Sequence, residues 1–287
     1  MLNRIIQQFG LKLKSINEVE DSFSSTVYKC TLSNGETVYL KIPFSNLKFQ
    51  RELEAYEILK GRVSVPEVLD YWVGDGECAG AFLLSELKGK PLTKEASPAL
   101  SYQVGVLHAE MHSIHPPKNK ELNGIKNKFP GWSHFIEQQF YSFAEDVKEV
   151  LDDPLYRKSL EKFEKMKHQL PAPDGPSFVH MDFRPANIIV NNERVSGVID
   201  FESVRFGSAE VDFTKLYRDF LSFDEHLYNA YQEGYNSVRP LIDLKHVLPF
   251  YRFVDAFNSI GWCKRRGIEK NAAFLEENMD RLKRWVL

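Results

Sequence analysis

Three side chains with the chemistry of a catalytic loop stand at fixed spacing in Phe178–Val190: His180, Asp182 and Asn187. The apolar runs on either side of them are too short for helices and predict strands, so the polar residues fall on a loop. A further acidic residue, Asp200, follows in the next apolar run. Polar side chains at the ends of rigid strands are held precisely enough for catalysis. This stretch therefore predicts a functional site.

These residue types suit the transfer of a phosphoryl group. In that reaction the protein positions the reactants, orients the attacking hydroxyl and neutralises phosphate charge. Asp182 is the predicted carboxylate for the hydroxyl, and Asn187 and Asp200 offer the oxygen ligands that Mg²⁺ prefers. Arg184 is placed to reach the transferred phosphoryl group. His180 is predicted to support the loop, not to act as an acid or base.

A lysine and a glutamate upstream complete this chemistry. The Asn34-Gly35 pair between two β-rich runs predicts a hairpin, and its second strand places Lys41 away from the frayed end. The helix predicted for residues 47–59 carries Glu52 on its apolar stripe, whereas Glu54 falls among its polar positions. A carboxylate on an apolar face needs a cation. We expect Lys41 to pair with Glu52.

The elements that carry these residues divide the chain in two. Residues 1–87 predict a mostly β lobe with one key helix, followed by a hinge near residues 85–90. Backbone groups of Ser85 and Leu87 in this hinge are predicted to bind a flat heterocycle where the lobes meet. Residues 88–287 predict a larger, mostly helical lobe, with two helices between residues 118 and 176. The expected fold class is α+β.

Composition excludes several classes of partner. The chain has 287 residues, of which 43% are hydrophobic and 27% charged, and its net charge is -3. Because basic residues form no long run, neither a nucleic acid nor a membrane is expected as a partner. The chain shows no apolar segment long enough to span a bilayer, so a cytoplasmic protein is expected. The three cysteines are expected to be reduced, and the oligomeric state is not readable.

A group of histidines in the helix predicted near residues 102–115 offers an alternative chemistry. His108, His112 and His115 are predicted on one face, which suggests a metal-dependent hydrolase. Ala109 stands where the zinc-protease pattern requires glutamate, and the neighbouring residues are apolar. Packing and hydrogen bonding are therefore the preferred roles for these histidines.

Taken together, these motifs resemble those of the aminoglycoside phosphotransferase and choline kinase family, which has the two-lobed protein-kinase-like fold. His180-Met-Asp-Phe-Arg-Pro-Ala-Asn187 is similar to the family's catalytic loop, and Val198-Ile-Asp-Phe-Glu202 to its metal-binding strand end. Lys41 and Glu52 correspond to its lysine and glutamate pair. Asp212 corresponds to the aspartate that supports the catalytic loop.

The resemblance implies that the chain uses ATP, or GTP, with Mg²⁺ to phosphorylate a hydroxyl group of a small molecule. Ser24, Ser25 and Thr26 stand where protein kinases have a glycine-rich loop, and their hydroxyls and amides are expected to meet phosphate. No activation-loop sequence follows Asp200, which argues against a protein substrate. A nucleotide-binding pseudokinase is the weaker alternative, since each motif position holds a competent residue.

The acceptor is the least determined part of the prediction. The resemblance places it on the C-terminal helices, where Tyr251, Asp255 and Trp262 share one side of a predicted helix, and Glu202 is a further candidate. An aspartate among aromatic residues suits a cationic amine, as in an aminoglycoside or choline. The opposing interpretation pairs Asp255 with an arginine inside the fold. An antibiotic acceptor and a metabolite acceptor, such as an amino alcohol or sugar, both remain open.

Overall fold

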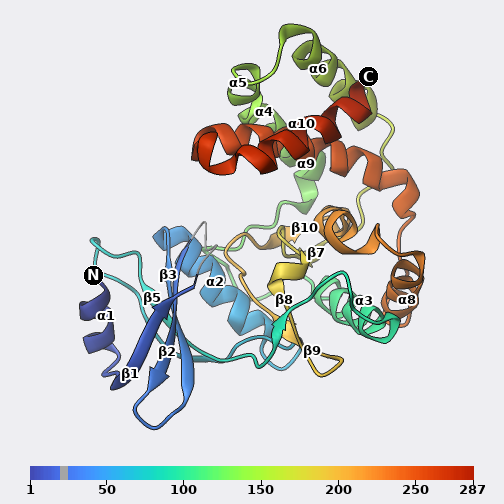
Figure 1. Cartoon of the computed structure of the whole chain (residues 1–287). Coiled ribbons are helices and arrows are strands. Elements are labelled where there is room, and N and C mark those ends of the chain that lie inside the picture. The colour runs from blue at the N-terminus through green and yellow to red at the C-terminus, as the bar shows by residue number, and fades with distance from the viewer. Residues whose placement is uncertain (20–24) are drawn as a thin grey trace.

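A five-stranded antiparallel sheet forms most of the N-terminal lobe in the computed structural model, which describes residues 1–19 and 25–287 (Figure 1). The spatial order of its strands is β1-β2-β3-β5-β4. The strands are β1 (Leu13–Glu18), β2 (Ser25–Leu32), β3 (Thr37–Pro43), β4 (Val68–Trp72) and β5 (Ala81–Ser85). Helix α1 (Leu2–Gln8) precedes the sheet, and helix α2 (Asn46–Leu59) follows β3.

Strand β3 lies at the centre of this sheet, where it pairs with β2 on one side and with β5 on the other. The predicted hairpin forms at Asn34-Gly35, where Gly35 adopts a φ of 91°. Val38 and Leu40 point to a small core that also contains Ile5 of α1. Lys41 pairs with Phe82 of β5, and Phe82 belongs to the large core on the other side. The alternation of side chains along β3 therefore directs Lys41 toward α2.

Helix α2 packs its apolar stripe on that second face of the sheet. Ser45 caps the helix by accepting a hydrogen bond from the Lys48 amide at 3.4 Å. Phe49 stacks on Phe82 with 4.6 Å between ring centroids, and Leu59 ends the buried stripe. Because Phe49 and Leu59 fix the helix against the sheet, the side chain of Glu52 between them is held toward Lys41 of β3.

The C-terminal lobe is mostly helical, as predicted, and two groups of helices build it (Figure 1). Three helices, and not the predicted two, lie between residues 118 and 176, because a short helix follows α4 directly. The α-helices are α3 (Pro98–His112), α4 (Trp132–Ser142), α5 (Ala144–Lys148), α6 (Asp153–Lys167), α7 (Phe213–Leu216), α8 (Glu225–Asn236), α9 (Leu244–Arg266) and α10 (Ala272–Val286). Figure 1 shows α4, α5, α6, α9 and α10 together at the top, and α3 beside α8 at the lower right.

Two small antiparallel sheets lie between the lobes and hold the loop with the predicted site. One has the order β6-β8-β9 and the other joins β7 to β10. Their strands are β6 (Lys90–Pro91), β7 (Ser177–Val179), β8 (Ile188–Asn191), β9 (Arg194–Val198) and β10 (Arg205–Gly207). The short helical turns are η1 (Phe129–Gly131), η2 (Pro185–Asn187), η3 (Ala209–Asp212), the π-helical η4 (Tyr217–Leu221) and η5 (Glu269–Asn271).

Helices α3 and α8 approach each other closely because each carries a glycine at their contact. A Cβ atom on Gly105 would lie 2.2 Å from the Tyr231 carbonyl oxygen, and one on Gly234 would lie 2.0 Å from that of Tyr102. The close approach lets the hydroxyls of Tyr231 and Tyr235 on α8 hydrogen-bond His108 and His112 on α3. The two glycines thus determine the packing below the site.

Cys30, Cys78 and Cys263 are buried free thiols. Within residues 1–19 and 25–287, none of the helices combines the length and the apolar character needed to cross a membrane.

Candidate active site

Asp182 lies on the loop between β7 and β8, and three side chains contact it. The Asn187 amide nitrogen donates to the Asp182 carbonyl at 2.9 Å and to its Oδ2 at 3.2 Å. The Lys215 ammonium is 2.5 Å from Oδ1, and the Arg184 Nε is 3.2 Å from Oδ2. The carboxylate is partly exposed, so it keeps both a fixed orientation and access to a ligand. Such a group can orient a hydroxyl and accept its proton.

The loop turns sharply just before Asp182, where Met181 adopts a φ of 67°. A residue other than glycine is strained in this left-handed region. Asp212 compensates, since its Oδ1 accepts the Met181 amide at 2.7 Å and its Oδ2 accepts the His180 amide at 2.5 Å. Burial raises the pKa of Asp212, but the neighbouring His108 and His112, the second of which lies 3.3 Å from its Oδ2, more than offset this, so its pKa is lowered. Asp212 thus stays ionised and holds the loop.

His180 connects this loop to the strand end that carries Asp200. Its Nδ1 accepts the Asp182 amide at 3.3 Å, and its Nε2 lies 3.0 Å from the Ile199 carbonyl oxygen, to which it donates in that tautomer. Both ring nitrogens are used within the protein. His180 has the contacts of a structural support, which agrees with the role that the sequence suggested.

Lys41 joins the N-terminal lobe to the same strand end. Its ammonium is 2.7 Å from Glu52 Oε1 and 2.8 Å from Asp200 Oδ1, so the predicted pairing with Glu52 is confirmed. Burial disfavours the charge on Lys41, but the carboxylates of Asp200 and Glu52 more than offset it, so the pKa of Lys41 is raised well above its usual value. Lys41 therefore carries a positive charge into the space between the lobes.

Asn187 directly precedes β8 and Asp200 follows the end of β9, so the two residues lie at the same end of this β-pair and together could hold a divalent cation. Ile188 pairs with Val198, and the Ile199 amide donates to the Asn187 carbonyl at 3.0 Å. The amide nitrogen of Asn187 is used on Asp182, which directs its side-chain oxygen elsewhere. Lys41 lowers the pKa of Asp200, against the effect of burial, so this carboxylate is ionised. An amide oxygen and an ionised carboxylate fit the donor set of Mg²⁺.

Glu54 occupies a different environment from the one expected. Its side chain is 7% exposed, although the helical pattern placed it among polar, solvent-facing positions. The reason is tertiary: the loop at residues 123–125 covers that side of α2 and donates backbone hydrogen bonds to the carboxylate. Helical periodicity reports only which face is apolar, and it does not register a polar loop that packs against the opposite face.

The residues predicted to contact the nucleotide lie around β2 and β5. Ser24 falls outside the described residues, whereas Ser25 and Thr26 begin β2, opposite the end of β3. Ser85 uses its hydroxyl and its amide on Glu67, at 2.8 Å and 2.9 Å. Leu87 follows β5 and is partly buried. The nucleotide contact of these residues stays a prediction.

The predicted acceptor residues are engaged inside the fold. Asp255 forms an ion pair with Arg218 at 2.6 Å, as the opposing interpretation of the sequence suggested. Tyr251 is buried and accepts a hydrogen bond from the Trp132 indole at 2.9 Å. Trp262 is partly buried and contacts the ring of Phe274, while Glu202 is 5% exposed and pairs with Lys48 at 2.8 Å. These contacts do not single out an acceptor surface.

The histidine group is a support for the loop. His108 and His112 are fully buried on α3, and each places its Nδ1 beside a tyrosine hydroxyl of α8. Their other nitrogens face Asp212, and the three candidate ligand atoms lie within 4.8 Å of one another. His115 lies beyond the end of α3, where it contacts the Pro176 carbonyl, so the three histidines do not share one helical face as predicted. Burial lowers the pKa of His108 to about 3, so it is neutral.

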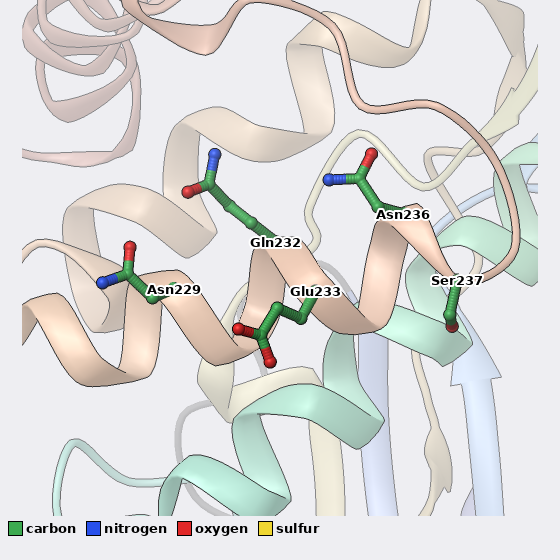
Figure 2. A pocket seen from close by; sticks show the side chains of 5 residues that line it. All are labelled: Asn229, Gln232, Glu233, Asn236 and Ser237. Atoms are coloured by element: carbon green, nitrogen blue, oxygen red, sulfur yellow. The ribbon is translucent and has the colours of Figure 1, made fainter.

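A surface pocket elsewhere is distinct from this site. Figure 2 shows Asn229, Gln232, Glu233, Asn236 and Ser237, which line it. All five belong to α8 or its C-cap, and their side chains point in different directions (Figure 2). Because no second element closes the pocket and no reactive pair is formed, this arrangement offers no chemistry comparable to that around Asp182.

The sequence assigned no role to two residues, Lys215 and Glu54, that make close contacts in the structure. Lys215 lies one helical turn after Asp212, so its position beside the loop could have been inferred from that spacing. Glu54 had no comparable signal, since the loop that binds it is distant in the sequence. Both depend on contacts between segments that are far apart along the chain.

A two-lobed fold that sets a lysine and glutamate pair opposite an aspartate and asparagine loop defines a phosphotransferase of the protein-kinase-like class. Residues 15–246 match the sequence profile described as "Phosphotransferase enzyme family". The chain belongs to this family and is a small-molecule phosphotransferase that acts on a hydroxyl group, as predicted.

Individual relatives agree with this assignment. The chain is 26% identical to an aminoglycoside 3'-phosphotransferase of Niallia circulans over 205 residues, which cover 68% of this chain and 74% of the relative. It is similar in structure to APH(2")-IIia, solved with GDP and kanamycin, with a TM-score of 0.79, 15% identity and coverage of 99% and 97% of the two chains. The macrolide 2'-phosphotransferase MphH of Brachybacterium faecium gives a TM-score of 0.71, 15% identity and coverage of 98% and 96%.

These likenesses confirm the predicted fold. They also support a nucleotide as the donor, since solved structures of this fold contain GDP, ADP or AMP-PNP.

Proposed function

We propose that this enzyme transfers the γ-phosphate of ATP or GTP, with Mg²⁺, to a hydroxyl group of an antibiotic. The observation that carries the proposal is the position of the Lys41 ammonium, 2.7 Å from Glu52 and 2.8 Å from Asp200, in a fold where Asp182 and Asn187 occupy the adjoining loop. A positive charge held between two carboxylates at the lobe junction is the arrangement that binds nucleotide phosphates.

Each site residue has a defined task in this proposal. Asp182 orients the acceptor hydroxyl and accepts its proton as the new bond to phosphorus forms. Asn187 and Asp200 hold Mg²⁺, which when bound neutralises phosphate charge. Lys41 binds the α and β phosphates, and Arg184 lies beside Asp182, where it can contact the transferred phosphoryl group. Residues 1–87 form the nucleotide lobe, and residues 88–287 supply the loop and the acceptor site.

An antibiotic is the favoured acceptor because the named relatives act on aminoglycosides or macrolides. A metabolite acceptor is not favoured by these comparisons. A nucleoside triphosphate donor places the reaction in the cytoplasm, where such donors are made.

Release of nucleoside diphosphate tests the proposal. Purified enzyme with Mg²⁺ and either ATP or GTP is offered aminoglycosides, macrolides, amino alcohols and sugars. We expect turnover with at least one antibiotic and a loss of roughly 10²-fold or more in Asp182→Asn, which removes the base but keeps its shape. Nucleotide binding without turnover on any acceptor would instead indicate a pseudokinase. Turnover that survives Asp182→Asn but not His112→Ala would overturn the assigned site.

A further inference from the structure

The buried carboxylate of Glu54 binds a row of backbone amides in the C-terminal lobe. Its Oε1 accepts the Asn123 amide at 2.7 Å and the Gly124 amide at 3.1 Å. Its Oε2 accepts the Gly124 amide at 3.0 Å and the Ile125 amide at 2.8 Å. Successive backbone amides that converge on one anion form a strong and directional binding site. A helix of the nucleotide lobe is therefore fastened to the other lobe by its own side chain.

The same contact is tight at the level of the backbone. A Cβ atom on Gly124 would lie 2.3 Å from the Arg51 backbone nitrogen, so only glycine permits this approach to α2. The Arg51 side chain strengthens it by donating to the Gly124 carbonyl at 3.3 Å and to the Glu202 carbonyl at 2.8 Å. Lys48, one turn earlier, pairs with the Glu202 side chain. One side of α2 thus carries polar contacts with two C-terminal segments.

Glu54 is two residues from Glu52, and the two side chains leave α2 in different directions. Glu52 is completely buried beside Lys41, whereas Glu54 points to the 123–125 loop. A helix moves as a rigid unit over so short a distance, so a displacement of one glutamate displaces the other. The position of the Glu52 carboxylate relative to Lys41 therefore depends on whether Glu54 remains bound.

We propose that Glu54 is a positioning residue for the nucleotide. Its bonds to the amides of residues 123–125 fix α2 in the position where Glu52 holds Lys41 toward the phosphates. The inference rests on the proposed function and adds to it a residue that does not touch the substrates. Because every bond comes from the chain itself, α2 reaches this position without a modification or a second protein.

The test compares Glu54→Gln with Glu57→Gln on the same helix. Glutamine has almost the shape of glutamate, but its NH₂ group cannot accept a hydrogen bond. In Glu54→Gln this NH₂ group would therefore face backbone N–H groups of residues 123–125, which are also donors. Glu57 is exposed and forms an ion pair with Lys120, which precedes the 123–125 loop. Its replacement removes one ion pair between α2 and that region, and an exposed ion pair contributes little to stability. We expect Glu54→Gln to lower kcat/KM for the nucleotide roughly 10- to 100-fold and to leave the acceptor KM within about twofold. Glu57→Gln should remain within about twofold for both.

A second variant reaches the contact from its other side. Gly124→Ala leaves every titratable group in place but forces α2 away from the loop, and it should produce the same loss in kcat/KM for the nucleotide. Circular dichroism at the assay temperature verifies that each variant is folded, and dissociation constants for the nucleotide are measured directly with ATP and GTP.

A double-mutant cycle with Lys41→Met separates positioning from general destabilisation. If Glu54 acts through Lys41, adding Glu54→Gln to Lys41→Met should change the nucleotide dissociation constant by less than about twofold. An undiminished effect in that background, or a folded Glu54→Gln and Gly124→Ala that match Glu57→Gln, would overturn the inference. Failure of the wild-type enzyme to bind nucleotide would count against the proposed function instead.

Discussion

The Lys215 ammonium lies 2.5 Å from the Oδ1 of Asp182. Lys215 belongs to α7, immediately after the turn that carries Asp212, so one short segment supplies both a support for the loop and a cation for its carboxylate. Arg184 is at the other oxygen of Asp182, at 3.2 Å. The proposed base is therefore held between two positively charged side chains, which fix the direction of its carboxylate.

Replacement of Lys215 should lower the rate of transfer more than the affinity for nucleotide. We expect Lys215→Met to reduce kcat by about 10- to 100-fold, because Asp182 loses the contact that orients one of its oxygens. The nucleotide dissociation constant should stay near the wild-type value, since Lys41 and Asp200 are unchanged. Steady-state kinetics with Lys215→Arg, which retains the charge, should show partial recovery. Equal kcat in Lys215→Met and in the exposed control Lys158→Met would refute this role.

Much of the site could be predicted from sequence because its parts are local. The spacing of His180, Asp182 and Asn187 defines one loop, and the alternation of β3 with the helical stripe of α2 directs Lys41 and Glu52 toward each other. Secondary-structure periods and turn residues are sufficient for such inferences. They also predict a mostly β lobe followed by a mostly helical one.

Other contacts could not be predicted because they join segments that sequence patterns treat separately. Glu54 has the polar neighbours of an exposed residue, yet a loop from the other lobe covers it. Asp255 shares a helical side with aromatic residues, which suggested a binding site for a cationic ligand. In the structure its carboxylate is instead paired with Arg218 of η4. The partner of a polar side chain is decided by tertiary packing, and no period in the chain reports it.

Burial of His108 should make the enzyme less stable in mild acid. Its pKa is lowered to about 3 by burial, whereas in the unfolded chain it is near 6.5. Between these values the unfolded state binds a proton that the folded state does not, so stability falls as the pH decreases below about 6.5. From pH 6.5 to 5.0 the loss from this group is about 2 kcal/mol.

Urea unfolding of His108→Phe at pH 7.5 and pH 5.0 measures this contribution. Phenylalanine can stack on Phe183 as the imidazole does, but it cannot hydrogen-bond the Tyr231 hydroxyl. The variant should therefore be less stable than the wild type at both pH values. The difference between its two free energies of unfolding should nevertheless be smaller than in the wild type. A pH dependence identical to that of the exposed control His226→Phe would show that His108 does not titrate as proposed.

Glu210 should have the opposite pH dependence. It is 3% exposed, and burial is the main reason that its pKa is raised to about 7 from an ordinary value of 4.5. Between these values the folded state binds more protons than the unfolded state, so this contribution to stability is lost as the pH rises toward 7. Glu210→Gln removes the titration and should be more stable than the wild type at pH 8.0, by up to about 3 kcal/mol.

The advantage of Glu210→Gln should shrink at pH 5.5, where the buried glutamate is already neutral. Urea titrations at both pH values measure the difference, with the exposed Glu233→Gln as the matched control. Glu210 hydrogen-bonds the Asp174 amide through Oε1, an acceptor that glutamine preserves. The prediction is wrong if the variant is equally or less stable than the wild type at pH 8.0.

Asp255 should prove to stabilise the fold, with little effect on acceptor binding. Its ion pair with Arg218 is largely buried, and Arg218 also binds Asp219 at 2.6 Å, so the arginine keeps one partner when Asp255 is changed. We expect Asp255→Asn to lower the free energy of unfolding by about 1–2 kcal/mol, because a charge-assisted bond becomes a neutral one. The acceptor KM should change less than about threefold, as in the exposed control Asp280→Asn. An acceptor KM raised more than tenfold at unchanged stability would instead mean that the acceptor displaces Arg218 and binds Asp255 itself.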